Sequence, residues 1–429
     1  MAEYSRREWL KLAALTQAGL FLGNKSLFAT CIDPLPKPKT ILLVSGWQDI
    51  NIGDIAHTPG LLHVLETFMP EAKVILWKVA NGAEVIALLQ KAFPKVKIVT
   101  GTPDANFDVS NPEVLQAFKD ADVMLHGSGP GIVGKSHLQA WVKATTKPFG
   151  IFGTTIDPVT ADLKTLLAKA DFIYTRETES IKVLAAAGLT GNNISFAPDA
   201  TFFMHIRDDA KAKAFMDANG LEERKFICAI PRLRKTPYWI EKPGSYTADQ
   251  IATYEALNEK WKEPDSAKLR EAMIAWVRET KNKVLVCPEM TYQVDVMDEM
   301  LIDPLPADVK PYIVKRGYWW PDEAASTYVK AHTVLSMECH SPIIAAANGT
   351  PFFYLRQPQD TIKGQMYYDL GFADWTFEIE DTQGSQIAAR LKSVWENYSD
   401  ARVKVATARK NIEKIYAKGV DAVYKMGTA

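Results

Sequence analysis

The chain has 429 residues, of which 47% are hydrophobic and 24% are charged, a composition typical of a globular protein long enough for two domains. A formal net charge of -1 provides no basic field for gathering nucleic acid, so we expect no nucleic-acid partner. The four cysteines, Cys31, Cys228, Cys287 and Cys339, lack both CxxC spacing and dense clustering, which argues against a disulfide scaffold or a zinc ribbon. One disulfide among the last three stays compatible with their number.

The first thirty residues have the form of a twin-arginine export signal. Arg6 and Arg7 precede the apolar run LAALTQAGLFLG, which is too short to cross roughly 30 Å of hydrocarbon as an anchor. An amphipathic first helix that carries two arginines is the alternative. We expect residues 1–30 to be a removed signal peptide, residues 31–39 to be a proline-rich spacer, and the mature protein to be periplasmic or extracellular without a stable membrane span.

From residue 40 to about residue 205, short apolar runs alternate with longer amphipathic stretches. The apolar runs cover 40–47, 73–79, 96–101, 121–127, 148–154 and 171–176. The helical patterns between and after them cover 60–69, 83–93, 112–120, 136–145 and 179–188. This alternation predicts a buried parallel sheet flanked by helices, and hence a doubly wound, Rossmann-like α/β domain over residues 40–205.

A second series with the same rhythm covers residues 206–375. Its strand candidates are 226–233, 283–290, 312–319, 332–339 and 350–356. Its helical patterns are 208–220, 270–281, 295–301, 321–331 and 342–349. We therefore expect a second Rossmann-like domain, a ligand cleft between the two domains, and C-terminal helices in residues 376–429 that pack across both.

The stretch GPGIVGKS, residues 129–136, matches the phosphate-binding loop of nucleotide hydrolases. A strand pattern precedes it and a helical pattern follows, so Lys135 could neutralise phosphate and Ser136 could hold magnesium. Such loops usually follow the first strand of their sheet, however, and this one follows about the fourth. An exported protein would also meet little ATP. We therefore favour a strand-to-helix turn at which Lys135 meets an anionic group of the substrate, with nucleotide hydrolysis as the alternative.

Five segments together, in their order along the chain, resemble the polysaccharide pyruvyl transferase family. They are the Asn51-Ile52-Gly53-Asp54 turn, HGSGP at 126–130, YTRETES at 174–180, APDA at 197–200, and HSPIIAAANGTP at 340–351. The resemblance extends from about residue 40 to residue 375. It implies a two-domain fold similar to that of the B-type glycosyltransferases, with the active site in the cleft.

The resemblance also implies a reaction, in which an enolpyruvyl group passes from phosphoenolpyruvate to sugar hydroxyls and forms a ketal. In that family the histidine matching His340 is taken as the acid that protonates the donor's methylene carbon. An arginine matching Arg232 or Arg234 binds the anionic donor. Histidine suits proton transfer near neutral pH, and guanidinium suits a carboxylate or phosphate. We therefore expect a polysaccharide or oligosaccharide partner and no cofactor beyond phosphoenolpyruvate as co-substrate.

One residue departs from the family pattern. The family usually has Arg-x-His where this chain has Glu338-Cys339-His340. Alternation along a strand would put Glu338 and His340 on the same face, beside the donor. At about 4 Å an arginine would attract a negative charge by roughly 1–4 kcal/mol, and a glutamate would repel it by about as much. Together with the expected export from the compartment that makes phosphoenolpyruvate, this substitution questions the donor.

The remaining candidates each have a structural alternative. Glu289 is either a candidate acid or base after a strand or an ordinary surface carboxylate, and Trp319 could stack on a sugar ring or close the core. Glu338 could form a structural ion pair with Arg232 or Arg316. The predicted substrate-binding residues are Arg232, Arg234, Asn51, Asp54, Gly127, Ser128, Lys135 and Trp319. The histidines lack the close spacing of a metal site, so we expect no metal.

Two other functions fit the same fold class. One is an exported lyase or hydrolase of an acidic polysaccharide, in which Glu338, Glu289 and His340 supply acid and base. The other is a periplasmic glycan-binding protein. The sequence leaves the sugar, the linkage and the oligomeric state unspecified.

Overall fold

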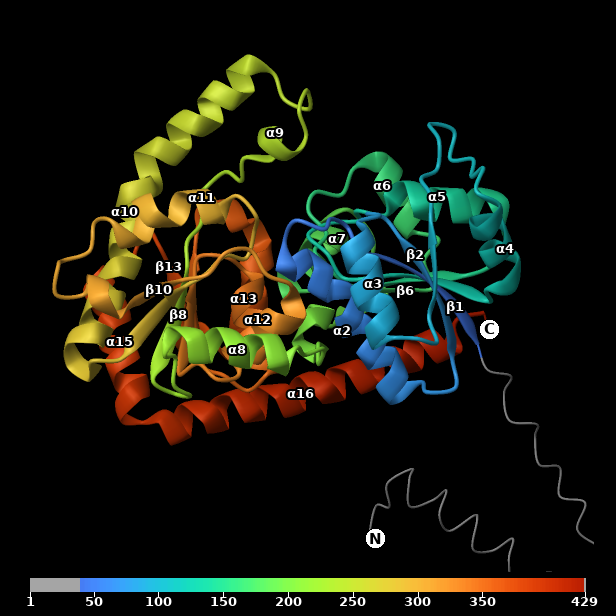
Figure 1. Cartoon of the computed structure of the whole chain (residues 1–429). Coiled ribbons are helices and arrows are strands. Elements are labelled where there is room, and N and C mark those ends of the chain that lie inside the picture. Colours follow the sequence, from blue (N-terminus) through green and yellow to red (C-terminus); the bar gives the residue numbers. More distant parts are fainter. Residues whose placement is uncertain (1–38, 428–429) are drawn as a thin grey trace, which may run out of the picture. The chain divides into compact units, whose positions relative to one another are not determined.

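A computed structural model describes residues 39–427, and the expected signal peptide lies outside the described residues. Two parallel sheets alternate with helices along the chain, which confirms the predicted α/β class. In Figure 1 the elements of the first sheet run from blue to green, and those of the second run from yellow-green to red. We call the parts built on these sheets the first half and the second half.

The first sheet has seven parallel strands in the order β3-β2-β1-β4-β5-β6-β7. They are β1 (Thr40–Ser45), β2 (Lys73–Lys78), β3 (Lys97–Thr100), β4 (Val123–His126), β5 (Phe149–Thr154), β6 (Phe172–Thr175) and β7 (Ile194–Phe196). The strand order reverses between β1 and β4, so the crevice of this sheet lies where these two strands end. The loops after them carry Asn51 and Ser128.

The second sheet has six parallel strands in the order β10-β9-β8-β11-β12-β13. They are β8 (Phe226–Ile230), β9 (Lys283–Val286), β10 (Ile313–Lys315), β11 (Thr333–Ser336), β12 (Phe352–Arg356) and β13 (Thr376–Glu378). The sheet thus extends three residues past 375, the expected end of its domain. Its order reverses between β8 and β11, and the segments after them carry Arg232, Glu338 and His340.

Helices connect the strands of each half. Those of the first half are α2 (Ile52–Phe68), α3 (Ala83–Ala92), α4 (Pro112–Asp120), α5 (Lys135–Ala144), α6 (Ala161–Leu167) and α7 (Thr178–Ala186). The second half has α8 (Asp209–Asn219), α9 (Tyr238–Glu241), α10 (Ala248–Thr280), α11 (Gln293–Met297), α12 (Pro321–Tyr328), α13 (His340–Ala347) and α14 (Gln365–Asp369). Short 3-10 turns include η1 (Ala200–Phe203), which follows β7. Within residues 39–427, no helix combines the length and the apolar content that crossing a lipid bilayer requires.

Two further helices, α15 (Gly384–Glu396) and α16 (Tyr398–Lys425), close the described chain. Helix α15 packs on α10, and α16 contacts α2 and η1 of the first half and α13 of the second. Tyr416 of α16 is buried and donates a hydrogen bond of 2.5 Å to the backbone oxygen of Asp199. Helix α16 therefore packs against the loop after β7 that contains Asp199.

Candidate active site between the two halves

Backbone hydrogen bonds join the loop after β1 to the loop after β9. The amide of Ile52 donates to the backbone oxygen of Glu289 at 2.9 Å, and the amide of Thr291 donates to that of Ile50 at 3.1 Å. Between them Asn51 caps α2, since its side chain accepts from the amides of Gly53 at 2.7 Å and of Asp54 at 3.3 Å. The cap fixes the first turn of α2 against the second half.

Glu289 holds His340 in a defined orientation. His340 begins α13, and its Nδ1 lies 3.1 Å from Oε1 of Glu289. The other carboxylate oxygen accepts from the amide of Ser341 at 2.6 Å and from its hydroxyl at 2.8 Å. Burial alone would raise the pKa of Glu289, but the contacts with His340 and Ser341 outweigh burial and keep that pKa below its usual value. A buried carboxylate at a helix N-terminus is stabilised by the same dipole that favours anions there.

On the first half, His57 of α2 is held in a similar way. Its Nδ1 lies 2.9 Å from Oδ1 of Asp199, whose Oδ2 pairs with Arg176 at 2.9 Å. His57, Arg176 and Asp199 are fully buried. Burial alone would lower the pKa of His57, but Asp199 and Asp54 outweigh burial and raise it to about 9. His57 therefore carries a positive charge at neutral pH.

The two histidines meet across the boundary between the halves. Their ring centroids are 4.9 Å apart with nearly perpendicular planes, and Nε2 of His340 lies 3.9 Å from Asp199. Asp54, one turn before His57 on α2, approaches Nε2 of His57 to 3.6 Å. Nε2 of His57 and Nε2 of His340 are both buried and have no hydrogen-bond partner. We call Asp54, His57 and His340 the interhalf cluster.

Gly53 allows this close approach, and its replacement is a direct test of it. A Cβ atom at Gly53 would lie 2.2 Å from Cβ and Cγ of His340, a distance that no neighbouring atom can relieve without moving α2 or α13. We expect Gly53→Ala to reduce the free energy of unfolding by about 1–3 kcal/mol, as overpacking does. Gly131→Ala is the control, because a Cβ there meets nothing within 4 Å. Equal denaturation midpoints for the two variants would contradict this packing.

Glu338 and Arg232 form a second buried group beside the cluster. Oε2 of Glu338 lies 3.3 Å from Nε of Arg232, and Arg232 also pairs with Asp360. Gln293 links Glu338 to Glu289. Its side chain donates a hydrogen bond to Glu338 at 2.7 Å and accepts one from the backbone amide of Glu289 at 2.6 Å. Burial raises the pKa of Glu338 to about 8, with Arg232 opposing the shift and Glu289 adding to it. Glu338 is therefore mostly protonated at neutral pH.

The placement of Glu338 differs from the expected strand alternation. Strand β11 ends at Ser336, so neither Glu338 nor His340 lies on a strand. The chain turns after β11 and His340 starts α13, which directs His340 to Glu289 and Glu338 to Arg232. Both side chains remain buried close to the boundary, but each has its own partners.

Arg234 and Lys135 have partners outside this site. Arg234 binds Asp265 through two hydrogen bonds of 2.8 and 2.9 Å, pairs with Glu380, and stacks on Trp261 at 3.7 Å from the ring centroid. Strand β8 ends at Ile230, so neither Arg232 nor Arg234 lies on a strand, and the two side chains have different partners. Lys135 pairs with Asp162 at a partly exposed position.

The glycine-rich turn after β4 contributes Ser128 to the site. Its hydroxyl lies 2.9 Å from Nδ1 of His57. Gly127 packs this turn on β1, since a Cβ there would lie 3.0 Å from the hydroxyl of Ser45. Trp319 is 2% exposed and donates to the backbone oxygen of Pro288 at 2.9 Å, so its ring belongs to the core of the second half.

His57, Arg176, Asp199 and Gln293 were not among the residues expected at the site. Arg176 and Asp199 lie in the segments YTRETES and APDA, which carried the family resemblance without an assigned role. His57 lies three residues after Asp54, a spacing that puts both on one face of a helix. That spacing was the available signal, but it says nothing of His340, which lies 283 positions further along the chain.

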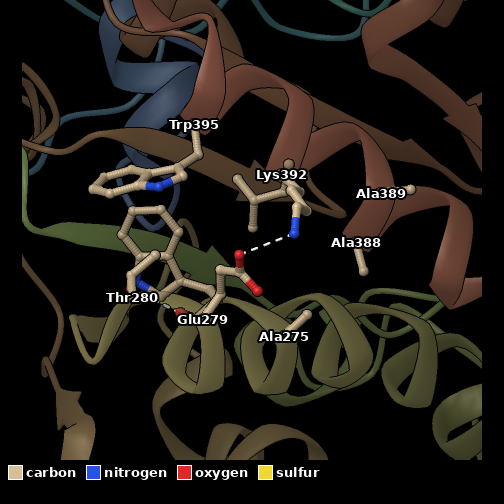
Figure 2. A pocket seen from close by; sticks show the side chains of 9 residues that line it. Ala275, Glu279, Thr280, Ala388, Ala389, Lys392 and Trp395 are labelled. Carbon is tan, nitrogen blue, oxygen red and sulfur yellow. Dashed lines mark hydrogen bonds and ion pairs between the residues drawn. The ribbon is translucent and has the colours of Figure 1, made fainter.

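A cavity of about 180 Å³ lies elsewhere, between α10 and α15 (Figure 2). Its walls are mainly apolar, with Trp276, Leu391 and Trp395 among them. Lys392 and Glu279 form an ion pair of 2.9 Å across it, and both side chains are exposed. This cavity shares none of its lining residues with the interhalf cluster, and its only ionisable groups already neutralise each other.

The chain is similar in sequence to one known protein family. The family model for polysaccharide pyruvyl transferase matches residues 51–357, which include the whole interhalf cluster. No curated protein sequence matches the chain.

Solved structures resemble the chain in fold. The MnaA–UDP complex of S. aureus has a TM-score of 0.56 at 12% identity, and the match covers 90% of this chain and 96% of that one. UDP-GlcNAc 2-epimerase from Neisseria meningitidis, bound to UDP-GlcNAc, has a TM-score of 0.54 at 11% identity and coverages of 90% and 100%. A glycosyltransferase from Rickettsia africae has a TM-score of 0.54 at 12% identity and coverages of 90% and 98%. These similarities confirm the expected glycosyltransferase-B-like fold.

Proposed function

Because the chain belongs to the polysaccharide pyruvyl transferase family, we propose that it is an enzyme that forms pyruvyl ketals on hydroxyl groups of a glycan. The observation that carries the proposal is the state of His340. Its Nδ1 is fixed by Glu289 at 3.1 Å, while its buried Nε2 has no partner. An imidazole held in this way can present one nitrogen to a substrate as a proton donor.

The proposed reaction uses phosphoenolpyruvate and two hydroxyls of one sugar. His340 delivers a proton to the methylene carbon, which becomes a methyl group, while the first hydroxyl bonds to the adjacent carbon and loses its proton. The second hydroxyl then bonds to the same carbon, and phosphate leaves together with the proton of the first hydroxyl. The products are a cyclic ketal and inorganic phosphate, and the proton taken from the second hydroxyl restores His340.

Arg232 is the proposed donor-binding cation, and the protonation of Glu338 decides whether it can act. An ionised Glu338 would repel an anionic donor, as the sequence suggested. With its pKa raised to about 8, Glu338 is largely neutral at pH 7 and adds little repulsion. A protonated carboxyl group can also donate a hydrogen bond to a donor oxygen.

This proposal predicts a pH effect at Glu338. Turnover should fall as the pH rises through about 8, because deprotonation then places a negative charge beside Arg232. Glu338→Gln should keep turnover at pH 7 and lose this alkaline decline, because glutamine stays neutral. Glu323→Gln is the control, since it removes a buried carboxylate that pairs instead with Arg316 at 2.6 Å. Parallel pH profiles for wild type and Glu338→Gln would exclude Glu338 as the ionising group.

The test of the function itself is phosphate release from phosphoenolpyruvate in the presence of a panel of neutral and acidic polysaccharides. Mass spectrometry of the digested glycan should show one pyruvyl ketal for each phosphate released. Absence of both products with every acceptor would refute the proposed donor.

A second candidate is cleavage of an acidic polysaccharide by elimination, which the raised pKa of Glu338 favours because a carboxyl group that titrates near neutrality can act as acid or base. In this reaction a base removes the proton beside the uronate carboxylate, and the bond to the neighbouring sugar oxygen breaks. The remaining double bond is conjugated with the carboxylate. New ultraviolet absorbance with uronate-containing polysaccharides, without phosphoenolpyruvate, would select this candidate.

A further inference from the structure

We infer that the interhalf cluster of Asp54, His57 and His340 binds a divalent transition-metal cation, for which Zn²⁺ is the best match. One ligand atom from each residue lies within 4.8 Å of the others, and all three residues are buried. Asp54 and His57 lie on α2, while His340 begins α13, so a bound cation would link the two halves. This site does not depend on the proposed reaction.

The two imidazoles offer ligating nitrogens to a metal, which would displace the proton that His57 carries at neutral pH. Nε2 of His57 and Nε2 of His340 have no hydrogen-bond partner, although His57 is fully buried and His340 is only 7% exposed. Asp54 lies 3.6 Å from one of these nitrogens. An unpaired polar atom in a buried position is unfavourable, and coordination of a cation would satisfy both nitrogens at once.

The carboxylates that contact the Nδ1 atoms of the two histidines also fit a metal site. Nδ1 of His57 contacts Asp199 at 2.9 Å, and Nδ1 of His340 contacts Glu289 at 3.1 Å. A metal-bound histidine commonly donates its second ring N–H to a carboxylate, which orients the ring and makes the ligating nitrogen more basic. Here both rings have such a carboxylate, and each carboxylate is fixed in turn, Asp199 by Arg176 and Glu289 by Ser341.

The chemistry of the donor set selects the cation. Two imidazole nitrogens and one carboxylate are the ligands of a three-residue zinc site that keeps a fourth position open. Magnesium and calcium prefer oxygen ligands. Ligand atoms around a tetrahedral zinc ion lie about 3.3 Å apart. Ligand atoms that now lie up to 4.8 Å apart must therefore approach one another by up to about 1.5 Å. The negative charges of Asp54 and Asp199 favour a cation at this place.

Occupation of the site has a consequence for the proposed reaction. A metal bound to Nε2 of His340 blocks the atom that would deliver the proton, so Zn²⁺ should inhibit pyruvyl transfer. If Zn²⁺ instead stimulates turnover, the acid role of His340 is overturned and the metal site stands. Turnover by the metal-free protein is measured separately, so failure of the site and failure of the function are distinguishable.

The experiment is a Zn²⁺ titration of purified, chelator-treated protein by calorimetry, with native mass spectrometry for stoichiometry. We expect one ion per chain in the wild type and at least a tenfold loss of affinity in Asp54→Asn and in His340→Asn. Glu289→Gln, which changes only a positioning residue, should weaken binding by about 10–100-fold. His63→Asn should bind normally, because His63 lies on the same helix but contacts Phe93 and His205.

Three results would overturn the inference. One is a wild-type protein that takes up no Zn²⁺. Another is undiminished uptake by the double variant His57→Asn/His340→Asn, which would locate the ion elsewhere. The third is a Co²⁺ spectrum without tetrahedral character. Cobalt substitution tests the site without the weakened variants, because the wild-type Co²⁺ protein should show the visible absorption of a tetrahedral site and His63→Asn should match it. An octahedral spectrum like that of aqueous Co²⁺ would likewise count against the site.

Discussion

Replacing Arg176 by leucine should lower the free energy of unfolding by about 3–5 kcal/mol, because it removes the arginine that pairs with the fully buried Asp199. Arg176 pairs with Asp199 at 2.9 Å and donates to the hydroxyl of Thr155 at 3.0 Å. His57, whose Nδ1 lies 2.9 Å from Oδ1 of Asp199, would then have to neutralise most of the charge of Asp199. Chemical denaturation at neutral pH measures the loss.

The control for Arg176 is another arginine–aspartate pair in the same chain. Arg278 contacts Asp308 through bonds of 2.9 and 3.1 Å, but both side chains are more than half exposed. Arg278→Leu should leave the denaturation midpoint nearly unchanged, because water already screens that pair. If the two leucine variants lose similar stability, burial of Arg176 is not the source of its effect.

The second large effect concerns His340. His340→Asn should reduce kcat by about 10²–10⁴-fold, the usual contribution of a positioned acid or base, while KM changes little. Asparagine at this position can still contact Glu289, so α13 should keep its N-terminal anchor. The rates are measured by initial-velocity kinetics with whichever donor and glycan the wild type turns over.

His63→Asn serves as the matched variant for these kinetics. His63 is partly exposed on α2, lies against the rings of Phe93 and His205, and accepts a hydrogen bond from the amide of His205 at 3.3 Å. It should keep the wild-type kcat. Circular dichroism of both variants checks that they fold. A folded His340→Asn with unchanged turnover would remove His340 from the mechanism.

The strands followed closely from the sequence because their signal is local. Apolar runs bounded by polar segments predicted eleven of the thirteen strands in the described part of the chain within a few residues. The two strands without a candidate are β7 and β13, each only three residues long. Helix α10 was recognised only from residue 270, although it begins at Ala248. Its first half is mostly exposed and contains Pro264, so it lacked the apolar periodicity on which the prediction rested.

The site was less predictable because its contacts are long-range. Glu289 and His340 were each named as candidates, but the sequence did not show that, 51 positions apart in the chain, they form one hydrogen-bonded pair. The expectation of no metal rested on histidine spacing in sequence, and that spacing contains no information on His57 and His340 meeting across two sheets. The sequence also does not show which charged residues pair with one another. Arg232 and Arg234, two positions apart, have different partners.

The two backbone hydrogen bonds between the loops after β1 and β9 make it possible to measure how often the two halves separate. The amides of Ile52 and Thr291 each donate across the boundary between the halves, to Glu289 and Ile50. Their protons can exchange with solvent whenever this boundary opens, even while both sheets remain folded. Hydrogen exchange at these two amides, compared with that of buried strand amides, therefore gives the free energy of separating the halves, and a ligand that bridges them would slow both rates together.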